Sequence, residues 1–184
     1  MSPAAARILL QGSVDAYAAA VGSKASAPGA GSVAALVAAL AAGLNEKVAR
    51  LAKDAPSRKL AAKMTQARKR LLRLVDEDAR SFAAVMAAWK AEPATRQRAL
   101  KAATRIPLAV CVDGAMLGDV AGRLALTAKP VIRADALAAE QLAGAASTAA
   151  RLMVDVNLRL ITDASFIEQT RRALEPCTPR TPTS

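Results

Sequence analysis

Apolar residues recur at helical spacing along almost the whole 184-residue chain, and no stretch shows the sustained alternation of a β-strand. Alanine supplies much of the 53% hydrophobic content, whereas aromatic residues make up only 2%. Alanine favours helix and lets helices approach closely, but each alanine buries little area. The sequence therefore predicts an all-α fold, an antiparallel bundle of about five or six helices. We expect an oligomer, because small side chains need further burial from a partner subunit.

Proline and glycine set the expected helix ends. The expected helices cover residues 3–21, 32–53, 57–91, 95–127, 135–161 and 163–174. Ser32, Ser57 and Asp135 are the expected N-caps of the second, third and fifth helices. Pro107 is expected to kink or restart the fourth helix.

Length and charge spacing predict one domain without a membrane helix. Residues 1–174 form the expected helical domain, and residues 175–184 form a flexible tail. No span of 18 or more residues is continuously apolar and uncharged, and the N-terminus lacks the layout of a signal peptide. Cys111 and Cys177 do not make a disulfide framework. The expected compartment is the cytoplasm.

The residues that several common kinds of catalysis require are absent from this sequence. The sequence contains no histidine, no Cys/His cluster, no Walker-type loop and no Ser/His/Asp set. The segment Gly29-Ala30-Gly31 does not follow a strand, so it is not a dinucleotide fingerprint. Catalysis must therefore use carboxylates, lysines, backbone amides or a reactive substrate, and we expect neither a metal nor a cofactor.

The segment Pro28-Gly29-Ala30-Gly31-Ser32 runs directly into an alanine-rich helix. The first N–H groups of a helix have no internal partner, and the helix dipole leaves partial positive charge there. This junction is consistent with a seat for an anion or polar ligand. It is equally consistent with a tight interhelical turn capped by Ser32.

A carboxylate interrupts the apolar stripe of the third expected helix. The stripe consists of Leu60, Met64, Ala67, Leu71, Leu74, Phe82, Val85 and Trp89. Asp78 fills the gap before Phe82, where a buried carboxylate is costly unless it is paired or used. Two interpretations remain open, a structural bond to a neighbouring helix end and a carboxylate that faces a ligand.

Basic residues crowd the segment from Lys47 to Arg73, which holds ten of them and one acidic residue, Asp54, in a chain of net charge +11. A solvated face is the simplest interpretation, and a site for a polyanionic small molecule comes next. Nucleic acid is a weaker alternative, because no nucleic-acid motif is present and the aromatic residues are scattered.

Four separated segments carry a further signal. Residues 26–35 resemble the motif Pro-Gly-Gly-Gly-Ser-x-Ala-Ala, and residues 76–88 resemble Asp-x-x-x-Phe-x-x-x-Met-x-Ala, with Asp78 at the Asp position. Residues 103–108 resemble Ala-x-x-Val-Pro-Leu, and residues 156–163 resemble Asn-Leu-x-x-Ile-x-Asp. In this order the motifs are similar to those of the formiminotransferase-cyclodeaminase C-terminal family, which includes stand-alone methenyltetrahydrofolate cyclohydrolases.

The resemblance implies a dimeric all-α protein that binds a tetrahydrofolate derivative. It implies hydrolysis of the 5,10-methenyl bridge, or loss of ammonia from 5-formiminotetrahydrofolate to form that bridge. We expect the cyclohydrolase first, because no transferase domain is fused to this sequence. The cyclodeaminase is the alternative.

The resemblance also assigns roles to residues. Asp135 is the candidate general base, and Asp78 would hold the pterin or orient the catalytic group. Substrate binding would involve Pro28, Gly29, Ala30, Gly31, Ser32 and Asn157. Lys53 and Lys59 of the basic segment would meet the glutamate tail of the folate.

Among the positions that depart from the family pattern are Ala30, Ala134 and Lys47. They motivate a second hypothesis, a non-catalytic family member that binds a folate-like ligand. Folate binding without turnover of either substrate would favour that hypothesis.

Overall fold

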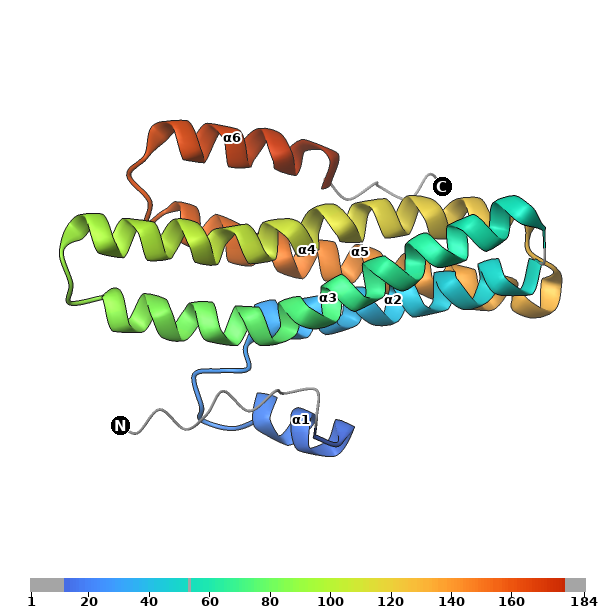
Figure 1. Cartoon of the computed structure of the whole chain (residues 1–184), viewed down its shortest axis with the longest axis horizontal. Helices are drawn as coiled ribbons and strands as arrows, with labels where there is room; N and C mark the ends of the chain where they lie inside the picture. The colour runs from blue at the N-terminus through green and yellow to red at the C-terminus, as the bar shows by residue number, and fades with distance from the viewer. Residues whose placement is uncertain (1–11, 53, 178–184) are drawn as a thin grey trace.

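The computed structural model describes residues 12–52 and 54–177 and is helical throughout those ranges apart from short connections. Four long helices, α2 (Ala30–Ala52), α3 (Ala55–Ala88), α4 (Pro93–Thr127) and α5 (Pro130–Leu158), run up and down in an antiparallel bundle (Figure 1). Helix α1 (Val14–Val21) stands beside the bundle, and α6 (Ala164–Leu174) lies along its outside, followed by the 3₁₀ turn η2 (Glu175–Cys177). The predicted all-α bundle is confirmed.

Small residues let the long helices approach closely. The buried face of α2 is mainly alanine, and Ala35, Ala38 and Ala42 are fully buried. Helices α4 and α5 form the most extensively packed pair. A Cβ built on Gly114 of α4 would lie 2.9 Å from the Ser147 Cβ and 3.0 Å from the Ala143 carbonyl oxygen of α5. Only glycine therefore fits at this crossing.

By length and composition alone, one described helix, α2, could cross a membrane, with a mean hydropathy of 1.4 over its most apolar window. Within the bundle, 61% of that window is buried. This burial is that of a core helix, which is apolar because α3, α4 and α5 surround it.

Three of the expected N-caps were wrong. Helix α2 starts at Ala30, so Ser32 lies inside it, and the Ser32 hydroxyl donates to the Val75 carbonyl of α3 at 2.6 Å. Asp54, rather than Ser57, caps α3 by accepting from the Ser57 N–H at 2.7 Å. Helix α5 starts at Pro130, so Asp135 is not a cap. In α3, α4 and α5 a proline stands at the first or second position of the helix, where the missing N–H needs no partner.

Other expected boundaries also changed. Helix α1 begins only at Val14, capped by the Ser13 side chain. Pro107 lies inside α4, which is assigned without interruption. The tail predicted from residue 175 is ordered as far as Cys177, which is buried beside Cys111. Burial first, and then the neighbouring Cys111 thiol, raise the pKa of Cys177 to about 12.

Helix α2 begins part-way along the bundle, so that α3, α4 and α5 continue beyond it (Figure 1). The first turn of α2 lies beside Asp78, and α3 runs ten residues further to Ala88, which is about 15 Å. Over this length α3 has no α2 beside it. Phe82, which belongs to the apolar stripe of α3, and Met86, one turn after it, are accordingly 40% and 54% exposed.

Candidate functional site

The first turn of α2 meets the Asp78 side chain of α3 at very short range. A Cβ built on Gly31 would lie within 2.9 Å of all three atoms of the Asp78 carboxyl group. The backbone N–H of Ser32 donates a hydrogen bond to the same carboxylate. Gly31 is therefore required here for close approach, and the helix start holds the carboxylate as expected for an anion at a helix N-terminus.

The electrostatics of Asp78 suit acid–base chemistry. Burial raises the pKa of the Asp78 carboxyl, and the Ser32 N–H partly offsets this by stabilising the charged form. No lysine or arginine forms a salt bridge with Asp78 in the part of the chain that the structure describes. The carboxyl is thus easier to protonate than an ordinary aspartate, in a setting typical of functional groups.

Tyr17 of α1 lies beside this carboxylate. Its hydroxyl is buried next to Ser32 but makes no well-aligned hydrogen bond with any described residue. Burial, followed by the charges of Asp78 and Asp76, raises the pKa of Tyr17, while Ser32 lowers it. A buried hydroxyl without a partner is uncommon, and a polar ligand atom would satisfy it.

Asp135 lies elsewhere. Its Oδ2 is 2.7 Å from the Lys47 Nζ of α2. Sixteen residues separate Gly31, beside Asp78, from Lys47, which is about 24 Å along the helix. Asp78 and Asp135 therefore do not converge within one chain, and only one of them can act at a given reacting atom unless two chains share a site.

The remaining predicted site residues are spread along the bundle. Pro28 is buried, Gly29 is half-buried with open space around its Cα, and Ala30 is exposed. Asn157 is half-buried near the end of α5. Lys59 is exposed near the start of α3, and Lys53 lies outside the described residues. Ser32 is fully buried, with its hydroxyl donated to Val75, so only its N–H serves the site.

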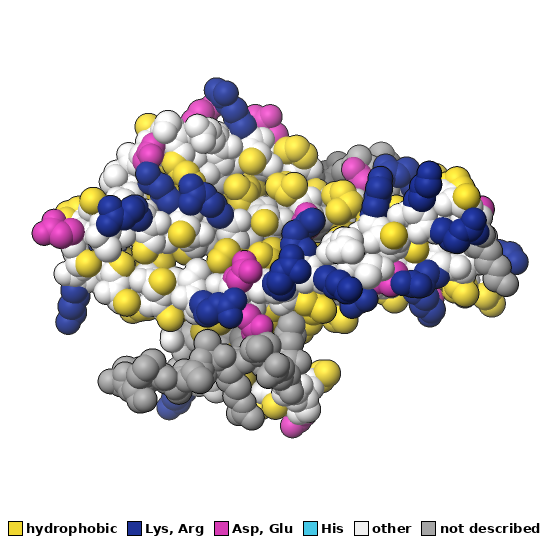
Figure 2. All heavy atoms as spheres, viewed as in Figure 1, with side chains coloured by type: hydrophobic (Ala, Val, Ile, Leu, Met, Phe, Trp, Pro, Cys, Tyr) yellow, Lys and Arg dark blue, Asp and Glu magenta, His cyan; other side chains and the backbone are white. Residues whose placement is uncertain are grey.

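The basic segment is partly neutralised by ion pairs. Glu46 accepts from Arg50 at 2.7 Å and from Arg68 at 3.0 Å, and Arg70 pairs with Asp113 on α4. Burial raises the pKa of Glu46, but Arg50 and Arg68 outweigh this effect, so the pKa lies below that of an ordinary glutamate. Lys and Arg side chains remain crowded over the N-terminal half of α3 (Figure 2). A cavity of about 410 Å³ is lined there by Gly43, Glu46, Lys47, Arg50, Leu51 and Arg68.

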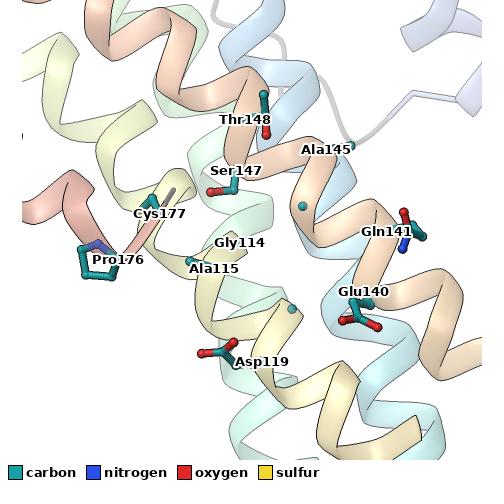
Figure 3. A pocket seen from close by; sticks show the side chains of 12 residues that line it. Gly114, Ala115, Asp119, Glu140, Gln141, Ala145, Ser147, Thr148, Pro176 and Cys177 are labelled. Atoms are coloured by element: carbon teal, nitrogen blue, oxygen red, sulfur yellow. The ribbon is translucent and has the colours of Figure 1, made fainter. Parts of the chain in front are cut away.

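A separate cavity of about 390 Å³ lies between α4 and α5, beside η2 (Figure 3). Asp119 from α4 and Glu140, Gln141, Ser147 and Thr148 from α5 surround it. None of the residues predicted from the sequence lines this cavity. It is therefore distinct from the Asp78 site.

Comparison with known proteins identifies the chain's relatives. Residues 13–176 match the family model described as formiminotransferase-cyclodeaminase. The chain belongs to the formiminotransferase-cyclodeaminase family. It is 33% identical to the pig formimidoyltransferase-cyclodeaminase over 84% of this chain and 32% of that one. It is 32% identical to the rat protein over 90% of this chain and 34% of that one. The chain thus spans about a third of these curated relatives.

A solved structure supports the same assignment. The crystal structure described as formiminotetrahydrofolate cyclodeaminase from Thermotoga maritima matches with a TM-score of 0.87 and 26% identity. The match covers 92% of this chain and 89% of that chain. The formiminotransferase-cyclodeaminase fold is therefore shared over nearly the whole length of both.

Two departures from the family motifs can now be placed. The Ala30 methyl group, where the family has glycine, is exposed, whereas the glycine beside Asp78 is retained as Gly31. Lys47, where the family lacks a charge, pairs with Asp135. The first change leaves the Asp78 site intact, and the second alters the surroundings of Asp135.

Sequence reasoning missed two polar residues of this family member. Tyr17 carried no signal beyond being one of few aromatic residues. Asn45 of α2 is fully buried and donates to the Leu117 carbonyl at 3.0 Å, while its Oδ1 has no partner among the described residues. Its place within an alanine-rich stretch was the available signal for a buried polar group.

Proposed function

We propose that this chain converts 5-formiminotetrahydrofolate into 5,10-methenyltetrahydrofolate with release of ammonia, with Asp78 acting at the reacting carbon. Family membership supports a folate one-carbon enzyme. A relative of nearly the same span is described as a formiminotetrahydrofolate cyclodeaminase, which favours deamination over the hydrolysis expected from sequence. The observation that carries the proposal is the Asp78 carboxylate held between Gly31 and Ser32.

The reaction requires proton transfer at one carbon. N10 of the folate attacks the formimino carbon, a C–N bond forms, and the bond from that carbon to the departing nitrogen breaks. The departing nitrogen must gain a proton and N10 must lose one. The Asp78 carboxylate can take the proton from N10 as that nitrogen attacks, and a pKa raised by burial lets it hold this proton and then give it to the departing nitrogen, which leaves as ammonia. The product cation is stabilised by the carboxylate that remains.

Hydrolysis of the methenyl bridge is the second candidate. The methenyl carbon is the same electrophilic centre. Water would add to it and lose its two protons, one to solvent and one through Asp78 to N5, as the bond from N5 to that carbon breaks and leaves a formyl group on N10. The carboxylate that stabilises the methenyl cation in deamination would also stand beside it in hydrolysis. Neither reaction uses a metal or a cofactor in this proposal.

The substrate would lie along α3. With the reacting carbon at Asp78, Lys59 is nineteen residues away, or about 28 Å along the helix. An extended polyglutamate tail can reach the basic segment, and we propose that Lys53 and Lys59 attract it. Asp135 then stays paired with Lys47 and away from the reacting carbon. We further propose a homodimer in the cytoplasm.

An assay with both substrates tests the proposal. Wild type should produce methenyl absorbance and free ammonia from 5-formiminotetrahydrofolate faster than the spontaneous rate, and Asp78→Asn should not. Loss of methenyl absorbance from 5,10-methenyltetrahydrofolate above the spontaneous rate would instead support hydrolysis. Tight folate binding without either turnover would support the non-catalytic hypothesis and overturn the enzyme.

A further inference from the structure

The apolar surface beyond the start of α2 continues directly from Asp78. Phe82 and Met86 follow Asp78 at one and two helical turns, so the three side chains share one face of α3. Eight residues separate Asp78 from Met86, which is about 12 Å. This face would have been covered by α2, but α2 begins beside Asp78.

The exposure of these residues is not a packing requirement. Val85 and Ala88, on the neighbouring side of the same turns, are 8% exposed and supply the contacts of α3 with the rest of the bundle. Phe82 and Met86 are 40% and 54% exposed and add little to that core. Val156 of α5 and Leu160, two residues after the end of α5, bring further apolar side chains to this end of the bundle, since they are 51% and 44% exposed.

A ligand that binds this surface must contact both the apolar side chains of Phe82 and Met86 and the polar groups of Asp78 and Tyr17. An exposed phenylalanine and methionine bind the face of a flat ring. Asp78 and the Tyr17 hydroxyl, which has no well-aligned hydrogen bond among the described residues, need polar atoms beside that ring. The pterin of a tetrahydrofolate has a flat ring face and carries its reactive nitrogen, N5, at one edge. Accepting the proposed function, this chemistry selects the pterin.

We propose that Phe82 and Met86 form a wall on which the pterin lies, with the one-carbon group at Asp78. This sets the direction of the substrate along α3. The pterin lies toward the C-terminal end of the helix, the reacting carbon lies at Asp78, and the tail points toward Lys59. The p-aminobenzoyl group is then on the opposite side of Asp78 from the wall.

Fluorescence of Trp89 provides a readout that does not need turnover. It is the only tryptophan of the chain, and it follows Phe82 by seven residues, or about 10 Å. Titration with folinate (5-formyltetrahydrofolate) should quench this fluorescence in wild type. Phe82→Ala should raise the Kd for folinate about tenfold, a loss typical of one ring-stacking contact. Phe82→Leu and Met86→Ala should raise it less.

Leu126→Ala is the matched control, because Leu126 is 82% exposed near the far end of α4. Its Kd for folinate should equal that of wild type. Two substrate fragments then test the direction. Competition by pterin-6-carboxylate should weaken in Phe82→Ala by the same factor as folinate, whereas competition by p-aminobenzoylglutamate should not change.

Three results would overturn this pterin site. The first is an equal Kd for folinate in Phe82→Ala and Leu126→Ala, and the second is an equal loss of competition by the two fragments in Phe82→Ala. The third is a changed oligomeric state of Phe82→Ala with unchanged affinity for folinate. The last result, seen by light scattering, would make this surface a subunit contact. If Phe82→Ala weakens folinate binding as expected but wild type turns over neither substrate, the proposed reaction is wrong and the pterin site at Phe82 and Met86 is supported. If wild type deaminates its substrate but Phe82→Ala binds folinate as tightly as wild type, only the proposed pterin site is wrong.

Discussion

The two ends of α2 hold carboxylates in opposite circumstances. At its start, Asp78 accepts a hydrogen bond from a backbone N–H and has no salt bridge with a lysine or arginine among the described residues, and burial raises its pKa. At its other end, Glu46 is bound by Arg50 and Arg68, and Asp135 by Lys47. The pairs at the second end satisfy their carboxylates. The first end keeps a carboxyl that exchanges a proton easily, and this is why we place the chemistry there.

The comparison predicts unequal effects of removing the two aspartates. Asp78→Asn should lower kcat about 10³-fold, because the variant cannot exchange the proton. Asp135→Asn should lower kcat by less than about tenfold, since its carboxylate only balances Lys47. Steady-state deamination and hydrolysis rates check both. The reverse order would move the catalytic role to Asp135, as the sequence resemblance suggested.

A mixture of the two variants sharpens this test. If the dimer shares its site between chains, then Asp78→Asn mixed with Asp135→Asn should exceed the summed activities of the two separate variants as hybrid dimers form. We expect no more than that sum, because Asp78 acts without Asp135 in the proposed reaction.

The next largest loss of kcat is expected from a substitution at Gly31, with Gly29 as its control. Gly31→Ala places a Cβ against the Asp78 carboxyl, and we expect a loss of about 10²-fold in kcat because the carboxyl is displaced. The same substitution should destabilise the fold by about 1–3 kcal/mol through overpacking. Gly29→Ala is the control, since no atom lies within 4 Å of its Cβ position. Equal rates for the two variants would show that the position of the carboxyl is unimportant.

The raised pKa of Asp78 also predicts how stability depends on pH. The folded state binds this proton more tightly than the unfolded state, so its stabilising contribution is complete below the ordinary aspartate pKa of about 4. It is lost as pH rises through the raised pKa. Asp78→Asn should therefore match wild type in thermal unfolding near pH 4 and exceed it at pH 7. An Asn variant that is less stable at pH 7 would contradict this.

The basic segment should give the smallest effect. Lys53→Ala combined with Lys59→Ala should raise KM for a polyglutamylated substrate about fivefold and leave kcat unchanged, because tail contacts are equal in ground and transition states. The monoglutamate should respond less. Lys90→Ala with Arg98→Ala is the control, since both side chains are exposed near the other end of the bundle. An equal response of both substrates would indicate a solvated face only.

Periodicity and breakers were sufficient to predict the helices of the bundle, because each helix buries one apolar face. The expected ends failed where a residue type has two roles. Pro93 and Pro130 were counted as breakers, yet each begins a helix. Ser32 was taken as a cap, although its hydroxyl donates to Val75 across the helix pair. Such roles depend on tertiary contacts that one sequence does not contain.

The site was predicted in part. The position of Asp78 in an apolar stripe marked it as unusual, and its contact with Gly31 joins two segments 47 residues apart. The resemblance gave both Asp78 and Asp135 roles in catalysis, but the structure separates the two along the length of the bundle. Tyr17 could not be found, since only the folded chain places α1 beside Ser32.

The crossing of α4 and α5 at Gly114 has a mechanical consequence. The backbone of α4 at Gly114 packs against Ser147 and Ala143 of α5, so the two helices cannot slide or rotate past each other without a clash. We expect this pair to move as one rigid unit. By contrast, α1 has no fully buried residue. We therefore expect a movement that admits a substrate to Asp78 to involve α1 and the connection that follows it, and a crosslink from α1 to α3 to slow substrate entry without disturbing the α4–α5 pair.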